Sequence, residues 1–222
     1  MTTWIGCEDA DALATEAARL IRAAAAEAIA RHGHFRLVLA GGTTPLATYR
    51  LLTEQPEGLA DWHLYYGDER CLPADDPQRN ASLVAETGLP THASRHHPIP
   101  AEACPEGAAV RYTATITPAL PFDLVLLGMG EDGHTASLFP GHHWPDQPVI
   151  PVENAPKPPS RRVSLGPTSL RACRQMLVLV SGEGKEEALR AWRAGEDLPV
   201  TRVADLPQAR VLVERNLLET AP

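Results

Sequence analysis

The stretch FDLVLLGMGEDGHTASLFPG, residues 122–141, decides how we interpret the fold of this chain. It begins with a short apolar run ending at Gly128, which is typical of a strand covered on both faces. A glycine-rich turn follows and carries Glu131, Asp132 and His134. Open α/β sheets bind their ligands just beyond the carboxyl ends of the strands. We therefore expect an active-site loop here, with His134 as its central residue.

The same order of strand, glycine turn and helix occurs twice more. Residues 35–40 lead through GGTTP into a helix at 46–52, and residues 176–180 lead through SGEGK into a helix ending near Trp192. Further strands are predicted at 62–67, 149–152, 161–165 and 210–213, and further helices at 9–31, 105–117 and 167–173. This alternation predicts a three-layer α/β/α fold with a mostly parallel sheet, in a single domain over residues 1–222.

The composition limits the class of protein. The formal net charge of −8 and the pI near 5.6 argue against nucleic acid or an anionic membrane as the main partner. No segment has the length of a bilayer span, and no basic segment followed by an apolar run opens the chain. The four cysteines lie far apart, without the spacing of a zinc site or a disulfide scaffold. We expect a cytoplasmic protein with reduced thiols.

Histidines gather in one proline-rich segment, residues 88–105. His92, His96 and His97 suggest a metal site, but no acidic or cysteine partner lies at ligand spacing. We interpret the segment as a surface loop and expect neither a metal nor a cofactor.

The GGTTP turn is a candidate phosphate site. At a helix start, the backbone N–H groups of Gly41, Gly42, Thr43 and Thr44 can bind an anion, aided by the helix dipole and by two hydroxyls. The alternative is a plain turn in which Thr44 caps the helix and proline follows in the first position. GGTTP matches neither common nucleotide-binding loop, so both interpretations stay open at this point.

Two cations and one amide are further candidates. Arg70 follows a predicted strand and could clamp a phosphate, with Asp68 or Glu69 fixing its orientation, although such a triplet is also common in solvated loops. Lys185 lies at a helix start, where a cation is unfavourable unless an anion binds there; a solvent-exposed lysine is the alternative. Asn80 either faces the site or simply lies near its helix start.

These residues favour acid–base chemistry on a phosphorylated metabolite. His134 can take a proton from water near neutral pH. Asp132 could hold the tautomer of His134 or shape the loop by accepting backbone N–H groups.

At this point the sequence resembles a known family. GMGEDGHTASLFPG is similar to the signature of 6-phosphogluconolactonases, and the blocks AGGTTP, YYGDERCLPADDPQRNAS, KPPSRRVSL and SGEGKEEAL agree in the same order. The resemblance implies a fold related to that of sugar-phosphate isomerases. It also implies an activity, the metal-free hydrolysis of 6-phosphoglucono-δ-lactone in the oxidative pentose phosphate pathway. It also implies that His134 is the general base, that Arg70, Lys185 and the GGTTP loop hold the phosphate, and that Arg162 is a further cation.

Two departures and two rival functions accompany the resemblance. Thr43 replaces the serine of the family's GGSTP form, and the ending ERNLLETAP is not alanine-rich. An isomerase or amino-sugar phosphate deaminase is disfavoured, because TASLFP follows His134 where a deaminase resembles IAFNEP. A sugar-phosphate sensor is disfavoured because no helix-turn-helix segment is found. Monomer and dimer both remain open.

Overall fold

The computed structural model describes residues 2–102 and 104–220. Seven strands form one sheet with only parallel pairings, in the order β1-β10-β9-β6-β2-β3-β5. The strands are β1 (Thr3–Cys7), β2 (Phe35–Leu39), β3 (Trp62–Tyr66), β5 (Arg95–His96), β6 (Phe122–Gly128), β9 (Cys173–Val180) and β10 (Ala209–Glu214). This confirms the predicted, mostly parallel sheet.

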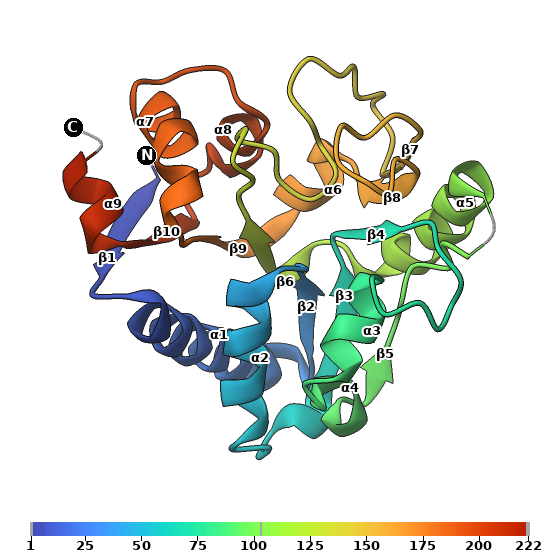
Figure 1. Cartoon of the computed structure of the whole chain (residues 1–222). Coiled ribbons are helices and arrows are strands. Elements are labelled where there is room, and N and C mark those ends of the chain that lie inside the picture. Colours follow the sequence, from blue (N-terminus) through green and yellow to red (C-terminus); the bar gives the residue numbers. More distant parts are fainter. Residues whose placement is uncertain (1, 103, 221–222) are drawn as a thin grey trace.

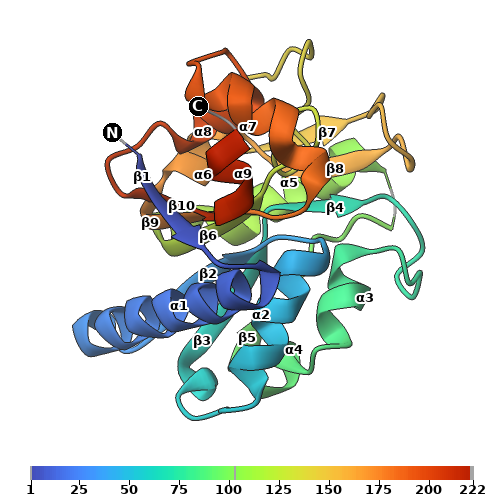
Figure 2. The ribbon, with the colours of Figure 1, turned by 60° about the vertical axis from the view of Figure 1, so that its left-hand side comes forward.

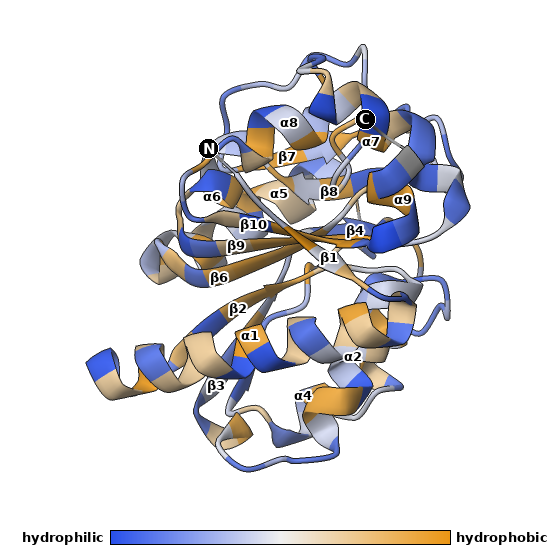
Figure 3. Ribbon diagram, turned by 90° about the vertical axis from the view of Figure 1, so that its left-hand side faces the viewer, coloured by the Kyte–Doolittle hydropathy of each residue, from blue (hydrophilic) through white to orange (hydrophobic). Residues whose placement is uncertain are grey.

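Helices cover both faces of this sheet, as Figures 1 and 3 show. One face carries α1 (Ala10–His32), α2 (Thr43–Thr53), α3 (Asn80–Ala85) and α4 (Leu89–His92). The other carries α5 (Pro105–Ile116), α6 (Pro167–Arg171), α7 (Glu186–Arg193), α8 (Pro199–Ala204) and α9 (Arg215–Thr220). Short 3₁₀ turns lie at η1 (Leu59–Asp61), η2 (Thr117–Ala119) and η3 (Glu183–Lys185). The three-layer prediction is therefore confirmed.

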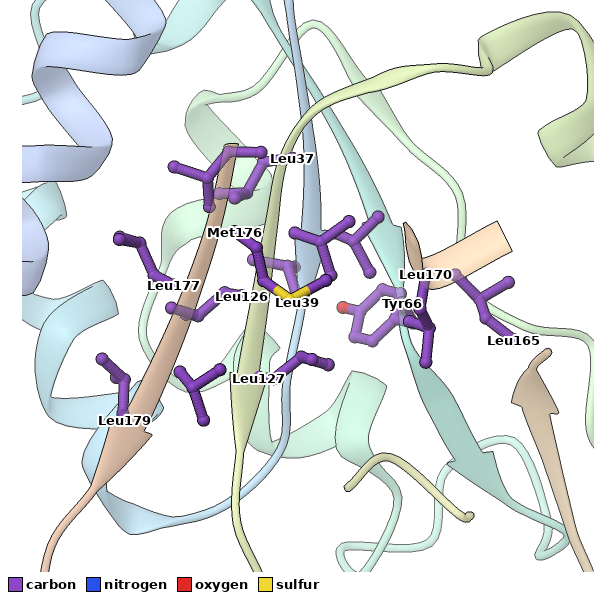
Figure 4. Close-up of a cluster of buried hydrophobic side chains, with 14 of the residues drawn as sticks. Leu37, Leu39, Tyr66, Leu126, Leu127, Leu165, Leu170, Met176, Leu177 and Leu179 are labelled. Carbon is purple, nitrogen blue, oxygen red and sulfur yellow. The ribbon is translucent and has the colours of Figure 1, made fainter. Parts of the chain in front are cut away.

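The central strand β6 lies between β9 and β2, so both its edges are paired, and the helices on the two sides of the sheet cover its faces (Figure 1). Leu126 and Leu127 are almost fully buried, and Figure 4 shows them between side chains of the neighbouring strands. Burying a leucine in this way stabilises a fold by roughly 1.5–3 kcal/mol. The apolar run therefore both forms the strand and holds the two helical layers together.

A second, smaller sheet lies beside α5 (Figure 2) and is antiparallel. It consists of β4 (Asp68–Arg70), β8 (Arg162–Leu165) and β7 (Val149–Val152), in that order. The alternative in which residues 68–70 form a solvated loop is wrong, because β8 pairs with them. The backbone N–H of Leu165 also donates to the carbonyl of Gly67, at 2.8 Å, which ties this sheet to the end of β3.

The histidine-rich segment is not a plain surface loop, which corrects that prediction. His92 ends α4, and His96 lies in β5, where its Nε2 is 2.8 Å from the hydroxyl of Tyr66. His97 stacks on Tyr65 with ring centroids 4.6 Å apart. The two later histidines thus pack on β3 as structural residues.

The helices in the described part of the chain do not meet the requirements of a membrane-spanning helix. None of them combines the length and the apolar character that crossing a bilayer requires.

Candidate active site

A cavity of about 210 Å³ lies beyond the carboxyl ends of β2, β3 and β6. It brings together most of the residues predicted from sequence: Gly41, Gly42, Arg70, Asn80, His134, Arg162 and Lys185. Asp132 lies behind His134, whereas Thr43 and Thr44 do not line the cavity. Loops from distant parts of the sequence therefore converge on one site.

The imidazole of His134 is held by Asp132. Its Nδ1 forms a short hydrogen bond with Oδ1 of Asp132, and the same oxygen accepts the backbone N–H of His134 at 3.2 Å. Burial raises the pKa of Asp132, but the hydrogen bond and charge of His134 outweigh it, so this pKa lies below its ordinary value. An ionised Asp132 keeps the proton on Nδ1 and leaves Nε2 of His134 free to accept one.

The loop around His134 is closed by its own backbone. The N–H of Gly130 donates to the carbonyl of His134 at 2.7 Å, and that of Gly133, where φ is 77°, donates to the carbonyl of Gly130 at 3.1 Å. A Cβ atom on Gly130 would lie 1.9 Å from Nδ1 of His134. The imidazole of His134 can therefore occupy this position only because residue 130 is a glycine.

The GGTTP turn opens α2 without any side-chain cap. Gly42, with φ of 104°, is the N-cap, so the alternative in which Thr44 caps the helix is wrong. Thr43 and Thr44 form the first turn of the helix, outside the lining of the cavity. The helix start can thus offer its N–H groups to an anion, with Gly41 and Gly42 facing the cavity.

Asn80 both begins α3 and lines the cavity. Its Nδ2 donates to the carbonyl and to Oδ1 of Asp68, at 2.9 and 3.0 Å, while its buried Oδ1 has no hydrogen-bond partner. A Cβ atom on Gly41 would lie 2.1 Å from this oxygen, so the amide packs directly on the glycine turn. Asp68 also accepts a hydrogen bond of 2.6 Å from Ser137.

Although the backbone N–H of Arg70 donates to Oε1 of Glu69 at 2.8 Å, the guanidinium of Arg70 is not held by its acidic neighbours, which corrects the sequence-based prediction. Its Nη1 donates instead to the carbonyl of Gln78. The buried carboxylate of Glu69 accepts the N–H groups of Asn80 and Ala81, at 2.7 and 2.8 Å, and so caps α3. Burial nevertheless raises the pKa of Glu69. The Nε of Arg70 is buried and has no partner, which leaves a donor directed at no protein group.

Arg162 and Lys185 complete the basic side of the cavity. The guanidinium of Arg162 donates to the carbonyl of Pro159 at 3.0 Å and to that of Lys157 at 2.9 Å, so it also fixes a loop. Lys185 ends η3 and is the N-cap of α7. Burial lowers the pKa values of both side chains, because each charge is withdrawn from water.

Lys157 lines the same cavity and was not among the predicted site residues. A signal was present in the composition: the chain has only two lysines, Lys157 and Lys185, among 20 basic residues. Within the described residues, no group of three or more histidine, cysteine or acidic side chains is arranged to hold a metal ion.

Comparison with protein families shows which family has this fold and sequence. The profile of the family described as glucosamine-6-phosphate isomerases/6-phosphogluconolactonase matches residues 8–213. The chain belongs to this family. A 6-phosphogluconolactonase of Mycobacterium tuberculosis is 34% identical over 95% of this chain and 91% of its own length. A human GDH/6PGL endoplasmic bifunctional protein is 36% identical over 79% of this chain, which corresponds to 24% of that protein.

Solved structures of family members share the fold. The 6-phosphogluconolactonase of Thermotoga maritima superposes with a TM-score of 0.87 at 29% identity, covering 96% of this chain and all of the other. A monomeric glucosamine-6-phosphate deaminase superposes with a TM-score of 0.84 over 99% of this chain and 100% of its own, at 23% identity. The expected relation to sugar-phosphate isomerases is thus confirmed at the level of the fold.

Proposed function

We propose that this chain is a 6-phosphogluconolactonase. It hydrolyses 6-phospho-D-glucono-1,5-lactone to 6-phosphogluconate, the second step of the oxidative pentose phosphate pathway. The observation that carries the proposal is an Asp132-bound His134 facing a cavity whose other wall is basic. The family and its lactonase relatives support the same substrate.

Binding begins with the phosphate. In this proposal it docks against the uncapped start of α2 at Gly41 and Gly42, with Thr43 and Thr44 in the first turn supplying further N–H groups. Arg70 and Lys185 neutralise its charge, and Arg162 adds a further cation from β8. Asn80 offers its unpartnered Oδ1 to a sugar hydroxyl. The lactone carbonyl is thereby held beside His134.

Chemistry then requires one base and one acid. Nε2 of His134 takes a proton from water, and the hydroxide forms a bond to the lactone carbonyl carbon. Asp132 stabilises the imidazolium that results. When the bond to the ring oxygen breaks, the imidazolium returns the proton to that oxygen. The second hydrogen of the water stays on the new carboxyl group, which then releases it to solvent and gives 6-phosphogluconate, so the protons balance without a covalent intermediate.

The oxyanion of the tetrahedral intermediate must be stabilised by hydrogen-bond donors or by a positive charge. Backbone N–H groups of the glycine loop or one of the cavity cations would supply them. No metal or cofactor has a role in this scheme, and we keep metal independence as part of the proposal.

The test is hydrolysis of freshly generated 6-phosphogluconolactone in a pH-stat, corrected for spontaneous hydrolysis. We expect turnover that a chelator does not reduce, and no deamination of glucosamine 6-phosphate. Loss of activity with chelator would contradict metal independence alone. Deaminase activity without lactonase activity would assign the site to the rival reaction, and ligand binding without turnover would indicate a sensor.

Other expectations remain predictions. They are a cytoplasmic location, the absence of a nucleic-acid partner, and a monomer or dimer as the oligomeric state.

A further inference from the structure

One acidic side chain at the edge of the cavity, Glu131, pairs with Lys157 and is influenced by the charge of Lys185, the other lysine of the chain. Oε2 of Glu131 accepts a hydrogen bond of 3.1 Å from Nζ of Lys157. Glu131 also lies against Gly184, where a Cβ atom would be 3.3 Å from its Oε1, and Gly184 directly precedes Lys185. The hydrogen bond from Lys157, then the charges of Lys157 and Lys185, lower the pKa of Glu131. We call these three residues, Glu131, Lys157 and Lys185, the rim cluster.

Lys157 lines two neighbouring hollows. It lines the cavity that contains His134, and it also lines a neighbouring hollow together with Glu131 and Asp132. Its backbone is fixed, because its carbonyl accepts a hydrogen bond of 2.9 Å from Arg162. The ammonium on its flexible stem can therefore turn from one hollow to the other while the loop stays in place.

The ion pair between Lys157 and Glu131 is weak. Side chains of Lys157 and Glu131 are 46% and 62% exposed, and ion pairs at such sites contribute little. A sugar phosphate carries about −1.5 to −2 charge at neutral pH, more than a carboxylate. A phosphate entering the cavity would thus attract the ammonium more strongly than Glu131 does.

We propose that Lys157 is a further substrate-binding residue, and that Glu131 is a built-in counter-ion that competes with the substrate's phosphate for it. This inference rests on the proposed function, since it takes the phosphate to bind at the basic side of the cavity. In the empty site Glu131 holds Lys157 at the rim. When the phosphate binds, Lys157 leaves Glu131 and joins Lys185.

The proposal predicts opposite effects for the two partners. Lys157→Gln removes an attraction and should raise KM for the phosphorylated lactone about 1.5- to 5-fold, with kcat nearly unchanged. Glu131→Gln removes the competitor and should lower KM by a similar factor. In the Lys157→Gln background, Glu131→Gln should have no further effect. Lys157→Arg should restore most of the binding.

The experiment measures KM, kcat and the inhibition constant of inorganic phosphate for these variants. A matched control is Glu153→Gln, which removes a carboxylate from another half-exposed pair, with Arg161 at 3.3 Å, outside the cavity. Unphosphorylated gluconolactone should show no change in any variant. Equal constants in all variants, or weaker phosphate binding in Glu131→Gln, would overturn the proposal. If the wild type lacks lactonase activity, the proposed function fails, and calorimetric titration with phosphate still tests the rim cluster.

Discussion

Gly130 leaves no space for a side chain next to the imidazole of His134. Because an added Cβ atom would lie 1.9 Å from Nδ1 and 2.1 Å from Cε1, Gly130→Ala must displace the ring. A displacement of about 1 Å at a catalytic group can cost about 10²-fold in rate. We expect kcat to fall by about that factor while the thermal unfolding midpoint changes little. A variant with full activity would contradict the proposed placement of the base.

The charge of Asp132 is predicted to matter more than its shape. Asp132→Asn keeps the side-chain volume but removes the carboxylate that holds Nδ1–H of His134. We expect kcat to fall by about 10²- to 10⁴-fold with a nearly unchanged KM, because the wrong tautomer is favoured and the imidazolium is not stabilised. Steady-state kinetics on the phosphorylated lactone checks this. A loss confined to KM would assign Asp132 to substrate binding instead.

The contacts of single residues were predictable from the sequence where both partners lie close together in the chain. Asp132 and His134 are two residues apart in a glycine loop, so their hydrogen bond follows from the turn. The roles of Asp68 and Glu69 were not predictable. Their partners, Ser137 and Asn80, come from segments 69 and 11 residues away, and only the folded chain brings them together.

At the level of elements, the starts of β2 and β3 form a stack of histidines at the end of the sheet remote from the cavity. His34 and His63 lie parallel, with centroids 4.9 Å apart. Burial, then the charges of His34, Arg95 and other neighbours, lowers the pKa of His63 to about 4. Burial also lowers the pKa of His34.

This stack predicts acid sensitivity of the fold. An unfolded histidine titrates near pH 6.5, so between about 6.5 and 4 the unfolded state binds more protons than the folded state. The free energy of unfolding should therefore decrease as pH falls through this window, and less so in His63→Gln. Urea unfolding at several pH values measures this free energy, and a His92→Gln variant, which changes an exposed histidine, serves as the control. An identical pH dependence in wild type and His63→Gln would contradict the assignment.

Elements with a strong local pattern were predicted, whereas several short ones with a weak local pattern were missed. The long α1 and the apolar β6 follow from periodicity and composition alone. β1 is a short edge strand with Gly6 in its interior, and it is stabilised by pairing with β10 at the other end of the chain. α8 has only six residues, and the N–H of Val200 in it donates to the carbonyl of Gly133 at 3.1 Å.

For the whole molecule, we still expect residues 1–222 to form a single domain. The buried hydrophobic residues form one cluster that includes members of β1 and of β10. Thermal unfolding followed by far-ultraviolet circular dichroism and by tryptophan fluorescence should give one coincident transition. Two separated transitions would indicate independent units.

The central claim is that His134 is the base of a lactonase. The direct measurement is the rate of 6-phosphogluconolactone hydrolysis by His134→Ala beside the wild type, in a pH-stat and corrected for spontaneous hydrolysis. Loss of the general base predicts a decrease in kcat of about 10²- to 10⁴-fold in a variant that still folds and binds phosphate. A folded His134→Ala protein that keeps the wild-type rate would contradict the account.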